Sequence, residues 1–334
     1  MQKYTMADVA HICGVSKATV SRVINGKTAG VGDETRKRVL HTLEQLNYRP
    51  NRFAQSVATS KSMLIGMILP DVSNLFYPAL MRGVVDALDQ HHYSLIICDS
   101  DYSVAKEREL LLKLVDQRVE GIILASGLSN EVFLREFRKY GIPLAIIGRT
   151  FDTHLSDTSI SGDNIRGAEI AVSQLISSGN RRILYLDGIE GASGSQQRRK
   201  GYMFALQEHG IDPDPDLMET GEFSIQFGMI ATANALDAGR DFTAVMTGSD
   251  LIAIGVLKEL RRRGIAVPKE IEVIGFDGIV VSEIFEPEIS TVTRPHYDMA
   301  YQAASNLIRI INGTMNEIRH VTVEPSLLLR ETTK

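Results

Sequence analysis

The stretch Gly14–Gly26, GVSKATVSRVING, decides how the amino-terminal part of the chain folds. Val20, Val23 and Ile24 repeat at i, i+3 and i+4, which predicts a short helix with one apolar face. Ser16 stands directly before this helix, where its hydroxyl can cap the first turn. So short a helix is not stable alone, and we expect its apolar face to pack on a neighbouring helix.

A preceding helix supplies that neighbour. Val9, Ala10 and Cys13 share one face, and Gly14 follows where a left-handed C-terminal cap is expected. Two short helices joined by a tight glycine turn form a helix-turn-helix, whose second helix fits the width of the major groove of DNA.

The exposed face of the second helix carries hydrogen-bond donors and one methyl group. Lys17 with Ser21, and Ala18 with Arg22, are i, i+4 pairs on the side away from the apolar face. Residues 1–62 hold ten Lys or Arg against four Asp or Glu, a net charge of +6, within a chain whose total is -5. A basic head on an acidic body is typical of a polyanion-binding module, although chance segregation of surface charge gives the same asymmetry.

The rest of the 334-residue chain has a different pattern. From Met63 onward, β-branched runs such as MLIGMIL and GIILAS alternate with helical patterns, which predicts βαβ units and parallel sheets. The polar loop Asp152–Asp163 lacks periodicity and separates two series of strands. We therefore expect two similar α/β lobes, with a ligand cleft where the carboxyl ends of their strands face each other.

These patterns give the domain boundaries. Residues 1–49 form the helical head, and residues 50–62 form a linker able to make a short hinge helix, because Pro50 stops the preceding helix. The body, 63–334, divides into a first lobe of 63–161 and 291–320 and a second lobe of 162–290 and 321–334. Helices are expected at about 78–90, 104–118, 164–178, 197–209, 226–238, 250–263 and 296–312.

Several classes of protein are disfavoured by the sequence. The two cysteines, Cys13 and Cys98, are far apart and without metal-ligand spacing, so we expect neither a disulfide framework nor a metal site, and a reducing cytoplasm fits best. No apolar segment is long enough to cross a membrane, and the amino terminus has no apolar signal core. The glycine-rich Gly191–Gly194 fits neither nucleotide-binding pattern, and we expect no cofactor and no enzymatic activity.

Short motifs are spread along the whole chain. In chain order they are TMADVA at 5–10, GVS at 14–16, TVSRV at 19–23, Asn25, NYRPN at 47–51, PDVSN at 70–74, DN at 163–164 with Gly167, GFD at 275–277 and STV at 290–292. Together they resemble the lactose/galactose repressor family of bacterial transcription factors. The resemblance implies an all-α helix-turn-helix head and hinge, followed by an α/β, two-lobed, periplasmic-binding-protein-like domain with parallel sheets.

The same resemblance implies a function. A homodimer would bind a pseudo-palindromic operator in double-stranded DNA and repress a carbohydrate or sugar-acid catabolic operon, under the control of a small-molecule effector. The chain ends without a leucine heptad, so dimers rather than tetramers are expected. A two-lobed solute-binding protein is the alternative, but it would need a signal peptide and would not need a basic head.

In the head, the resemblance implies that Lys17, Ala18 and Arg22 read base edges, since Lys and Arg suit guanine and a methyl group suits thymine. The residues expected to hold phosphate or otherwise bind the DNA are Thr5, Ser16, Thr19, Ser21 and Asn25. Ser16 could equally be a helix cap and nothing more.

In the linker, Asn51, Gln55 and Ser56 would add minor-groove or backbone contacts. Val57 stands where the family has a leucine that wedges into a minor-groove base step. Valine is shorter, so shallower insertion and simple apolar packing between paired hinge helices both remain open.

In the body, the resemblance implies an effector-binding cleft. Its expected residues are Phe76, Tyr77, Arg149, Arg198, Phe223, Ser249, Asp277 and Arg294. Arg198 and Asp277 would hold hydroxyls or charged groups of a sugar, and Phe223 would stack on its ring. Three guanidiniums in one cleft are costly without an anion, so we expect a phosphorylated or acidic sugar, unless Arg149 and Arg294 make salt bridges across the lobes.

Overall fold

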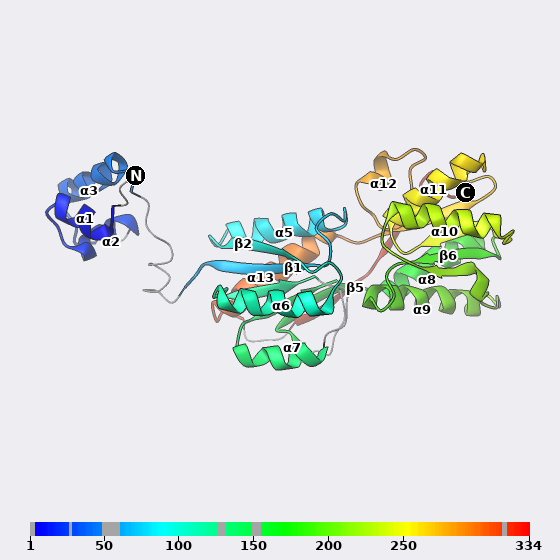
Figure 1. Ribbon diagram of the computed structural model, residues 1–334, viewed down its shortest axis with the longest axis horizontal. Helices are drawn as coiled ribbons and strands as arrows, with labels where there is room; N and C mark the ends of the chain where they lie inside the picture. Colours follow the sequence, from blue (N-terminus) through cyan, green and yellow to red (C-terminus); the bar gives the residue numbers. More distant parts are fainter. Residues whose placement is uncertain (1–3, 27–28, 49–60, 126–130, 149–154, 316–318) are drawn as a thin grey trace. The chain divides into compact units, whose positions relative to one another are not determined.

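The computed structural model describes residues 4–26, 29–48, 61–125, 131–148, 155–315 and 319–334 (Figure 1). The chain divides into two compact units, Met1–Ser62 and Met63–Lys334. The predicted hinge segment falls almost wholly on 49–60, outside the described residues.

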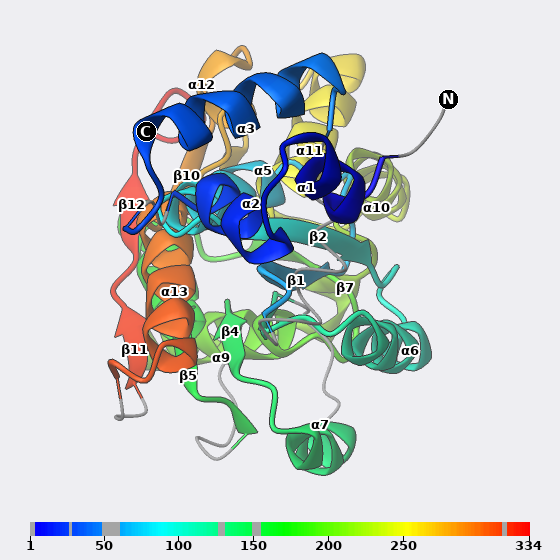
Figure 2. The ribbon, with the colours of Figure 1, turned by 90° about the vertical axis from the view of Figure 1, so that its left-hand side faces the viewer.

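The amino-terminal unit is a bundle of three helices (Figure 2): α1 (Met6–Ile12), α2 (Lys17–Ile24) and α3 (Asp33–Gln45). Gly14 has φ +60°, so it takes the left-handed conformation that lets α2 turn away from α1. The side chains buried between the three helices are Val9, Ala10, Cys13, Val20, Val23 and Val39. The predicted helix-turn-helix and its apolar face are confirmed.

The second unit holds two six-stranded sheets, each covered on both faces by helices (Figure 1). The first sheet has the order β11-β5-β4-β3-β1-β2, and all of its pairs are parallel. Its strands are β1 (Leu64–Leu69), β2 (Ser94–Asp99), β3 (Gly121–Leu124), β4 (Leu144–Ile147), β5 (Thr158–Gly162) and β11 (Arg319–Val323). Its helices are α5 (Tyr77–Asp89), α6 (Val104–Asp116), α7 (Glu131–Phe137) with a 3-10 turn (Arg138–Tyr140), and α13 (His296–Ile311).

The second sheet has the order β12-β10-β9-β8-β6-β7, parallel except for the antiparallel β10–β12 pair. Its strands are β6 (Ile183–Asp187), β7 (Met218–Thr220), β8 (Ala244–Thr247), β9 (Glu272–Asp277), β10 (Ser290–Thr293) and β12 (Ser326–Leu328). Its helices are α8 (Asn164–Ser177), α9 (Ser193–Glu208), α10 (Ile225–Asp237), α11 (Asp250–Arg263) and the short α12 (Val281–Ile284), with a 3-10 turn at Pro215–Leu217.

Each lobe is a three-layer sandwich with an apolar core on both faces of its sheet. In the first lobe α5 and α13 cover one face and α6 and α7 the other; in the second lobe α10 and α11 lie opposite α8 and α9 (Figure 1). The paired helices approach closely at glycine: a Cβ added at Gly83 of α5 would collide with the carbonyl oxygen of Tyr297 in α13. Buried apolar area on both sheet faces is the main stabilising term for such lobes.

Sheet membership corrects the lobe boundaries expected from the sequence. Strand β5 lies within the segment 152–163, where a structureless loop was expected. Its sequence, TSISG, is buried along its length but rich in serine and threonine, so it lacks the apolar run typical of a central parallel strand. Strand β10 belongs to the second lobe although 291 onward was assigned to the first, and β11 extends the first lobe to Val323 rather than 320.

Candidate functional site

The outer face of α2 presents charged and polar groups to solvent. Lys17, Ala18 and Arg22 are exposed, and the first turn of α2 has no acidic residue. The positive end of the helix dipole and the N–H groups of the first turn are therefore not neutralised by a carboxylate within the helix. This face can donate hydrogen bonds to phosphate and to base acceptors.

The hydroxyls of the head are partly used in capping. The Ser16 hydroxyl accepts a hydrogen bond from the Thr19 amide at 3.1 Å and lies 2.9 Å from the Thr19 hydroxyl. The Thr5 hydroxyl accepts from the Asp8 amide at 3.3 Å, and the Thr5 backbone amide donates to Asp8 Oδ2 at 2.7 Å, a reciprocal capping box on α1. Capping is thus an observed role of Ser16 and Thr5, beside the phosphate contact expected of them.

At the end of α2, the Asn25 amide donates to the Ser21 carbonyl oxygen at 2.9 Å. Asn25 is exposed, so its amide group stands at the edge of the same face as Arg22. The other expected DNA contacts, Asn51, Gln55, Ser56 and Val57, lie outside the described residues.

A cavity in the second unit is lined by residues from both lobes. Almost all of them follow the carboxyl end of a strand, as the sequence predicts for such a fold. They include Asn74 after β1, Tyr102 after β2, Ala125 after β3, Gly148 after β4, Asn164 after β5, Ser193 after β6, Phe223 after β7, Asp277 at the end of β9 and Arg294 after β10.

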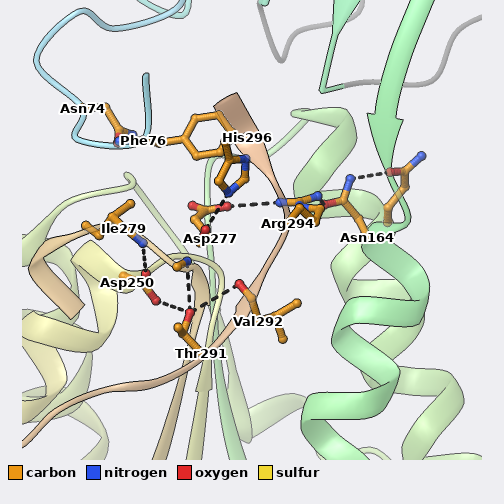
Figure 3. A network of polar contacts seen from close by, with 12 residues as sticks. Asn74, Phe76, Asn164, Asp250, Asp277, Ile279, Thr291, Val292, Arg294 and His296 are labelled. Carbon is orange, nitrogen blue, oxygen red and sulfur yellow. Dashed lines mark hydrogen bonds and ion pairs between the residues drawn. The ribbon is translucent and has the colours of Figure 1, made fainter. Parts of the chain in front are cut away.

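Arg294, which lines the cavity, is held by two partners (Figure 3). Its Nη2 lies 3.3 Å from Asp277 Oδ1, and its Nη1 donates to Asn164 Oδ1 at 2.9 Å. The Asn164 amide in turn donates to Gln197 Oε1 of α9 at 2.8 Å. Burial lowers the pKa of Arg294 to about 10, which leaves the guanidinium charged at neutral pH.

Asp277 belongs to a strained turn. It has φ +106° without being glycine, and the following Gly278 has φ +67°. Burial raises the pKa of Asp277 to about 6, against the attraction of Arg198 and Arg294. The carboxylate is the counter-ion of Arg294, and it titrates closer to neutrality than an exposed aspartate does.

Asp250 and Thr291 hold that turn from below (Figure 3). The Thr291 hydroxyl donates to Asp250 Oδ1 at 2.6 Å, and it accepts from the Gly278 amide at 3.2 Å. Asp250 Oδ2 accepts from the Ile279 amide at 2.8 Å. Burial raises the pKa of Asp250 to about 8, so this carboxyl is costly to ionise and acts through its hydrogen bonds.

His296, the first residue of α13, also lines the cavity. Its Nε2 lies 2.6 Å from the carbonyl oxygen of Asp277, and its ring packs edge-on against Phe76 with centroids 4.8 Å apart. Burial, with help from Arg294, lowers the pKa of His296 to about 4. The neutral ring must then donate from Nε2, because a carbonyl oxygen can only accept.

Arg198 of α9 also lines the cavity, and it has no carboxylate within salt-bridge distance among the described residues. It is only 6% exposed, and its guanidinium carbon lies 5.4 Å from the Phe223 ring centre and 5.0 Å from that of Phe276. Its Nε has no hydrogen-bond partner in the described part of the chain. A buried cation held by two aromatic faces keeps the edge of its planar fork available for a ligand.

The structure brings together six of the eight expected cleft residues: Phe76, Tyr77, Arg198, Phe223, Asp277 and Arg294 all line the cavity. Ser249 does not line it. Its hydroxyl caps α11 by accepting from the Ile252 amide at 3.3 Å, so capping is its observed role. Arg149 lies outside the described residues.

The sequence reasoning missed some lining residues. Asn164 appeared only as part of a motif, and Tyr102, Ser193 and His296 were not singled out at all. The available signal was positional, since each follows closely after a strand whose carboxyl end faces the cavity.

Two features are absent from the described residues. Over that part of the chain, no helix is both long and apolar enough to cross a membrane. Likewise, among those residues no group of three or more His, Cys, Asp or Glu is placed to hold a metal ion.

Comparison with known proteins gives matches along the whole chain. The model described as bacterial regulatory proteins, lacI family, matches residues 5–51, and that of the periplasmic binding protein-like domain matches residues 172–333. Catabolite control protein A of Priestia megaterium is 34% identical over 331 residues, covering 99% of both chains. The ribose operon repressor of Bacillus subtilis (strain 168) is 37% identical over 308 residues, covering 92% of this chain and 91% of the relative.

Among solved structures, that of a transcriptional regulator CelR–cellobiose complex superposes with a TM-score of 0.74 at 29% identity, covering 98% of this chain and 99% of the other. The predicted fold class, a helical head followed by a two-lobed α/β body with parallel sheets, is confirmed by these matches and by the sheet topology.

Proposed function

Because this chain belongs to the LacI family of bacterial regulatory proteins, we propose that it represses a carbohydrate or sugar-acid catabolic operon by binding a pseudo-palindromic operator as a homodimer in the cytoplasm. The observation that carries this proposal is the solvent-facing side of α2, where Lys17, Ala18 and Arg22 are exposed beside a helix amino terminus whose first turn has no acidic residue. Lys17 and Arg22 would bond guanine acceptors, and the Ala18 methyl would touch a thymine methyl.

An operator-binding assay tests this function. Affinity of the full chain for promoter fragments of its own genome should exceed affinity for random duplex, and it should fall steeply as salt rises. Arg22→Ala should weaken specific binding roughly 10- to 100-fold while changing non-specific binding far less. Lys258→Ala removes an exposed cation from α11 and serves as the control. Equal affinity for promoter and random fragments at every salt concentration would refute the proposal.

We further propose that the cavity binds an acidic or phosphorylated sugar as effector. The support comes from Arg198, which is buried with no carboxylate within salt-bridge distance among the described residues, while Arg294 is paired with Asp277. The names of two relatives also mention sugars: one is a cellobiose complex and the other a ribose operon repressor. Phe223 offers a ring face on which a pyranose can stack.

Effector binding would act on DNA by shifting the arrangement of the two lobes. Three chain crossings join the lobes, after β5, after β10 and after β11. A ligand that prefers one arrangement would shift that equilibrium and change the spacing of two heads in a dimer, with the linker 50–62 folding or unfolding in response. Operator titrations with and without saturating effector measure this coupling directly, and the sign distinguishes an inducer from a corepressor.

A further inference from the structure

One carboxylate ties together the amino ends of three strands in the first lobe. Glu120 stands directly before β3, Met63 directly before β1, and Tyr93 directly before β2. Glu120 Oε1 accepts from the Met63 amide at 2.7 Å, and Glu120 Oε2 accepts from the Tyr93 hydroxyl at 2.9 Å. Both carboxylate oxygens therefore hold the starts of neighbouring strands, and we call these three residues the Glu120 anchor.

The anchor holds Met63 in an unusual backbone conformation. Met63 has φ +56°, in the left-handed region that a residue with a side chain rarely adopts. Its carbonyl oxygen accepts from the Ser94 amide at 2.9 Å, so both backbone polar groups of Met63 are bonded within the first lobe. Such a conformation is strained, and it persists where the surrounding bonds over-determine it. Met63 is thus a fixed corner at the place where the second compact unit begins.

The bond between Glu120 and Tyr93 is shielded from water. Tyr93 is only 5% exposed and belongs to the apolar cluster beneath α5 and α13. Burial, together with the hydrogen bond to Glu120, raises the pKa of the Tyr93 phenol well above its ordinary value. Hydrogen bonds to a carboxylate are stronger than those between neutral groups, and removing this acceptor would leave a buried hydroxyl without its partner. The anchor is therefore costly to break.

The anchor and the cavity lie at opposite ends of the first lobe. Residues that follow the carboxyl ends of the strands line the cavity, whereas the anchor precedes the amino ends of β1, β2 and β3. Helix α6 joins the two ends, since it begins just after the cavity-lining Tyr102 and ends shortly before Glu120. A displacement of α6 at the cavity can thus reach Met63, the first residue after the linker 50–62, through packed and hydrogen-bonded groups.

From this arrangement we propose that Glu120 is a positioning residue for operator binding: its carboxylate fixes the corner at Met63, so that the linker leaves the body from one point and in one direction. Two heads that must reach two half-sites at a set spacing depend on such a fixed exit, because a loose exit adds conformational freedom that binding must remove. Non-specific contact of a head with phosphate has no such requirement. This inference rests on the proposed operator-binding function and names a residue through which the body acts on it.

DNA titrations of the full chain test this role, with the promoter fragment that the wild type prefers and with random duplex. Glu120→Ala removes both bonds, and we expect it to weaken promoter binding roughly 3- to 30-fold while binding to random duplex stays within about threefold of wild type. Glu120→Gln can still accept from the Met63 amide and donate to the Tyr93 oxygen, so it should restore most of the loss. Glu109→Ala, which removes an exposed carboxylate of α6 paired with Lys113, is the control and should bind like wild type.

Limited digestion with trypsin gives a second measurement that needs no DNA. Lys61 is exposed and stands just before the corner at Met63. Cleavage follows the population of the locally opened chain, so the anchor should slow cleavage after Lys61. Cleavage after Arg52, farther along the linker, is the internal reference, and mass spectrometry identifies both products. Glu120→Ala should raise the rate at Lys61 relative to that at Arg52 by roughly threefold or more.

A variant of the corner itself keeps the test decisive if Glu120→Ala fails to fold. Met63→Pro lacks the amide donor and cannot adopt a positive φ, whereas the bond between Glu120 and Tyr93 is left in place. It should show the same loss of promoter preference and the same faster cleavage after Lys61.

The outcomes separate the anchor from the wider function. If Glu120→Ala and Met63→Pro both keep the wild-type preference for the promoter fragment, or if Glu120→Gln loses as much affinity as Glu120→Ala, the positioning role is refuted. A wild-type chain without any preference for promoter DNA would instead remove the proposed regulatory function. The ratio of tryptic cleavage at Lys61 and Arg52 would then still show whether Glu120 holds the corner.

Discussion

Two buried arginines line the cavity, and their surroundings differ. Arg294 has a carboxylate at 3.3 Å and an amide oxygen at 2.9 Å, whereas Arg198 lies over two aromatic faces and has no carboxylate within salt-bridge distance among the described residues. A buried cation with its own counter-ion is part of the structure, since removing it leaves that counter-ion uncompensated. A buried cation without one is poised for a charge that comes from outside. The contrast separates a positioning role from a ligand-binding role within one cavity.

Removing the paired arginine should produce the largest effect on stability. Arg294→Met leaves Asp277 and Asn164 buried without their partner, and we expect a loss of about 3–5 kcal/mol in the free energy of unfolding. Urea denaturation followed by circular dichroism measures it. Arg294→Gln retains a donor for Asn164 and is the milder comparison. A loss below about 1 kcal/mol for Arg294→Met would mean that the pair is not structural.

The pH dependence of the free energy of unfolding should reveal the burial of His296, which lies against the carbonyl oxygen of Asp277. The pKa of His296 is about 4 in the folded chain against an ordinary value of 6.5, so on acidification the unfolded chain takes up this proton first. Wild type should therefore lose about 2–3 kcal/mol relative to His296→Phe as pH falls from 6.5 to 4. Asp277 has the opposite sign, because its pKa is raised from 3.8 to about 6 and its proton favours the folded chain over that range.

The measurement is a comparison of denaturation curves of the two proteins at several pH values. Arg294 and Asp277 are the charged groups that contact or surround His296, and both are present in each protein. Between pH 7 and 8 the difference in free energy of unfolding should stay constant. A difference that does not change between pH 6.5 and 4 would show that His296 is solvated rather than buried.

The hydrogen bonds that Thr291 makes at the turn after Asp277 should contribute less to the free energy of unfolding. Thr291→Val removes a donor to Asp250 and an acceptor for the Gly278 amide, leaving two buried groups short of a hydrogen bond. We expect a loss of about 1–3 kcal/mol in the free energy of unfolding. Thr322→Val, at an exposed position of strand β11, is the control and should cost less than about 1 kcal/mol. Equal losses in the two variants would indicate a strand effect rather than support of the turn.

The sequence alone could not predict most of the contrast between Arg198 and Arg294, although it did predict the fold around them. The helix-turn-helix, the two lobes and the strand-end position of the site follow from local periodicity, which is read directly from residues such as Val20 and Val23. Strand β5 was missed because its serines and threonines are buried by tertiary context that no local pattern records. Which arginine meets an acid depends on long-range contacts: Arg294 and Asn164 are 130 positions apart in the chain.

The same limit applies at single residues. Ser249 was expected in the cleft, and the structure shows its hydroxyl capping α11 through the Ile252 amide, away from the residues that line the cavity. Ser193 was overlooked because a serine inside a helix's first turn has no sequence mark of function. Only the observation that its hydroxyl is buried and unpaired in the described structure singles it out.

The smallest expected change in stability comes from the unpaired arginine, and it is the most informative. Arg198→Met keeps an apolar side chain between Phe223 and Phe276 and removes a buried charge that no carboxylate contacts among the described residues, so the free energy of unfolding should stay within about 1 kcal/mol of wild type. The cation–π attraction that the substitution removes and the desolvation penalty that it relieves are of similar size and opposite sign. Denaturation in the absence of ligand measures this, with Arg294→Met as the contrasting variant. A loss as large as that of Arg294→Met would mean that Arg198 has a structural counter-ion after all. The two arginines would then have the same stabilising role.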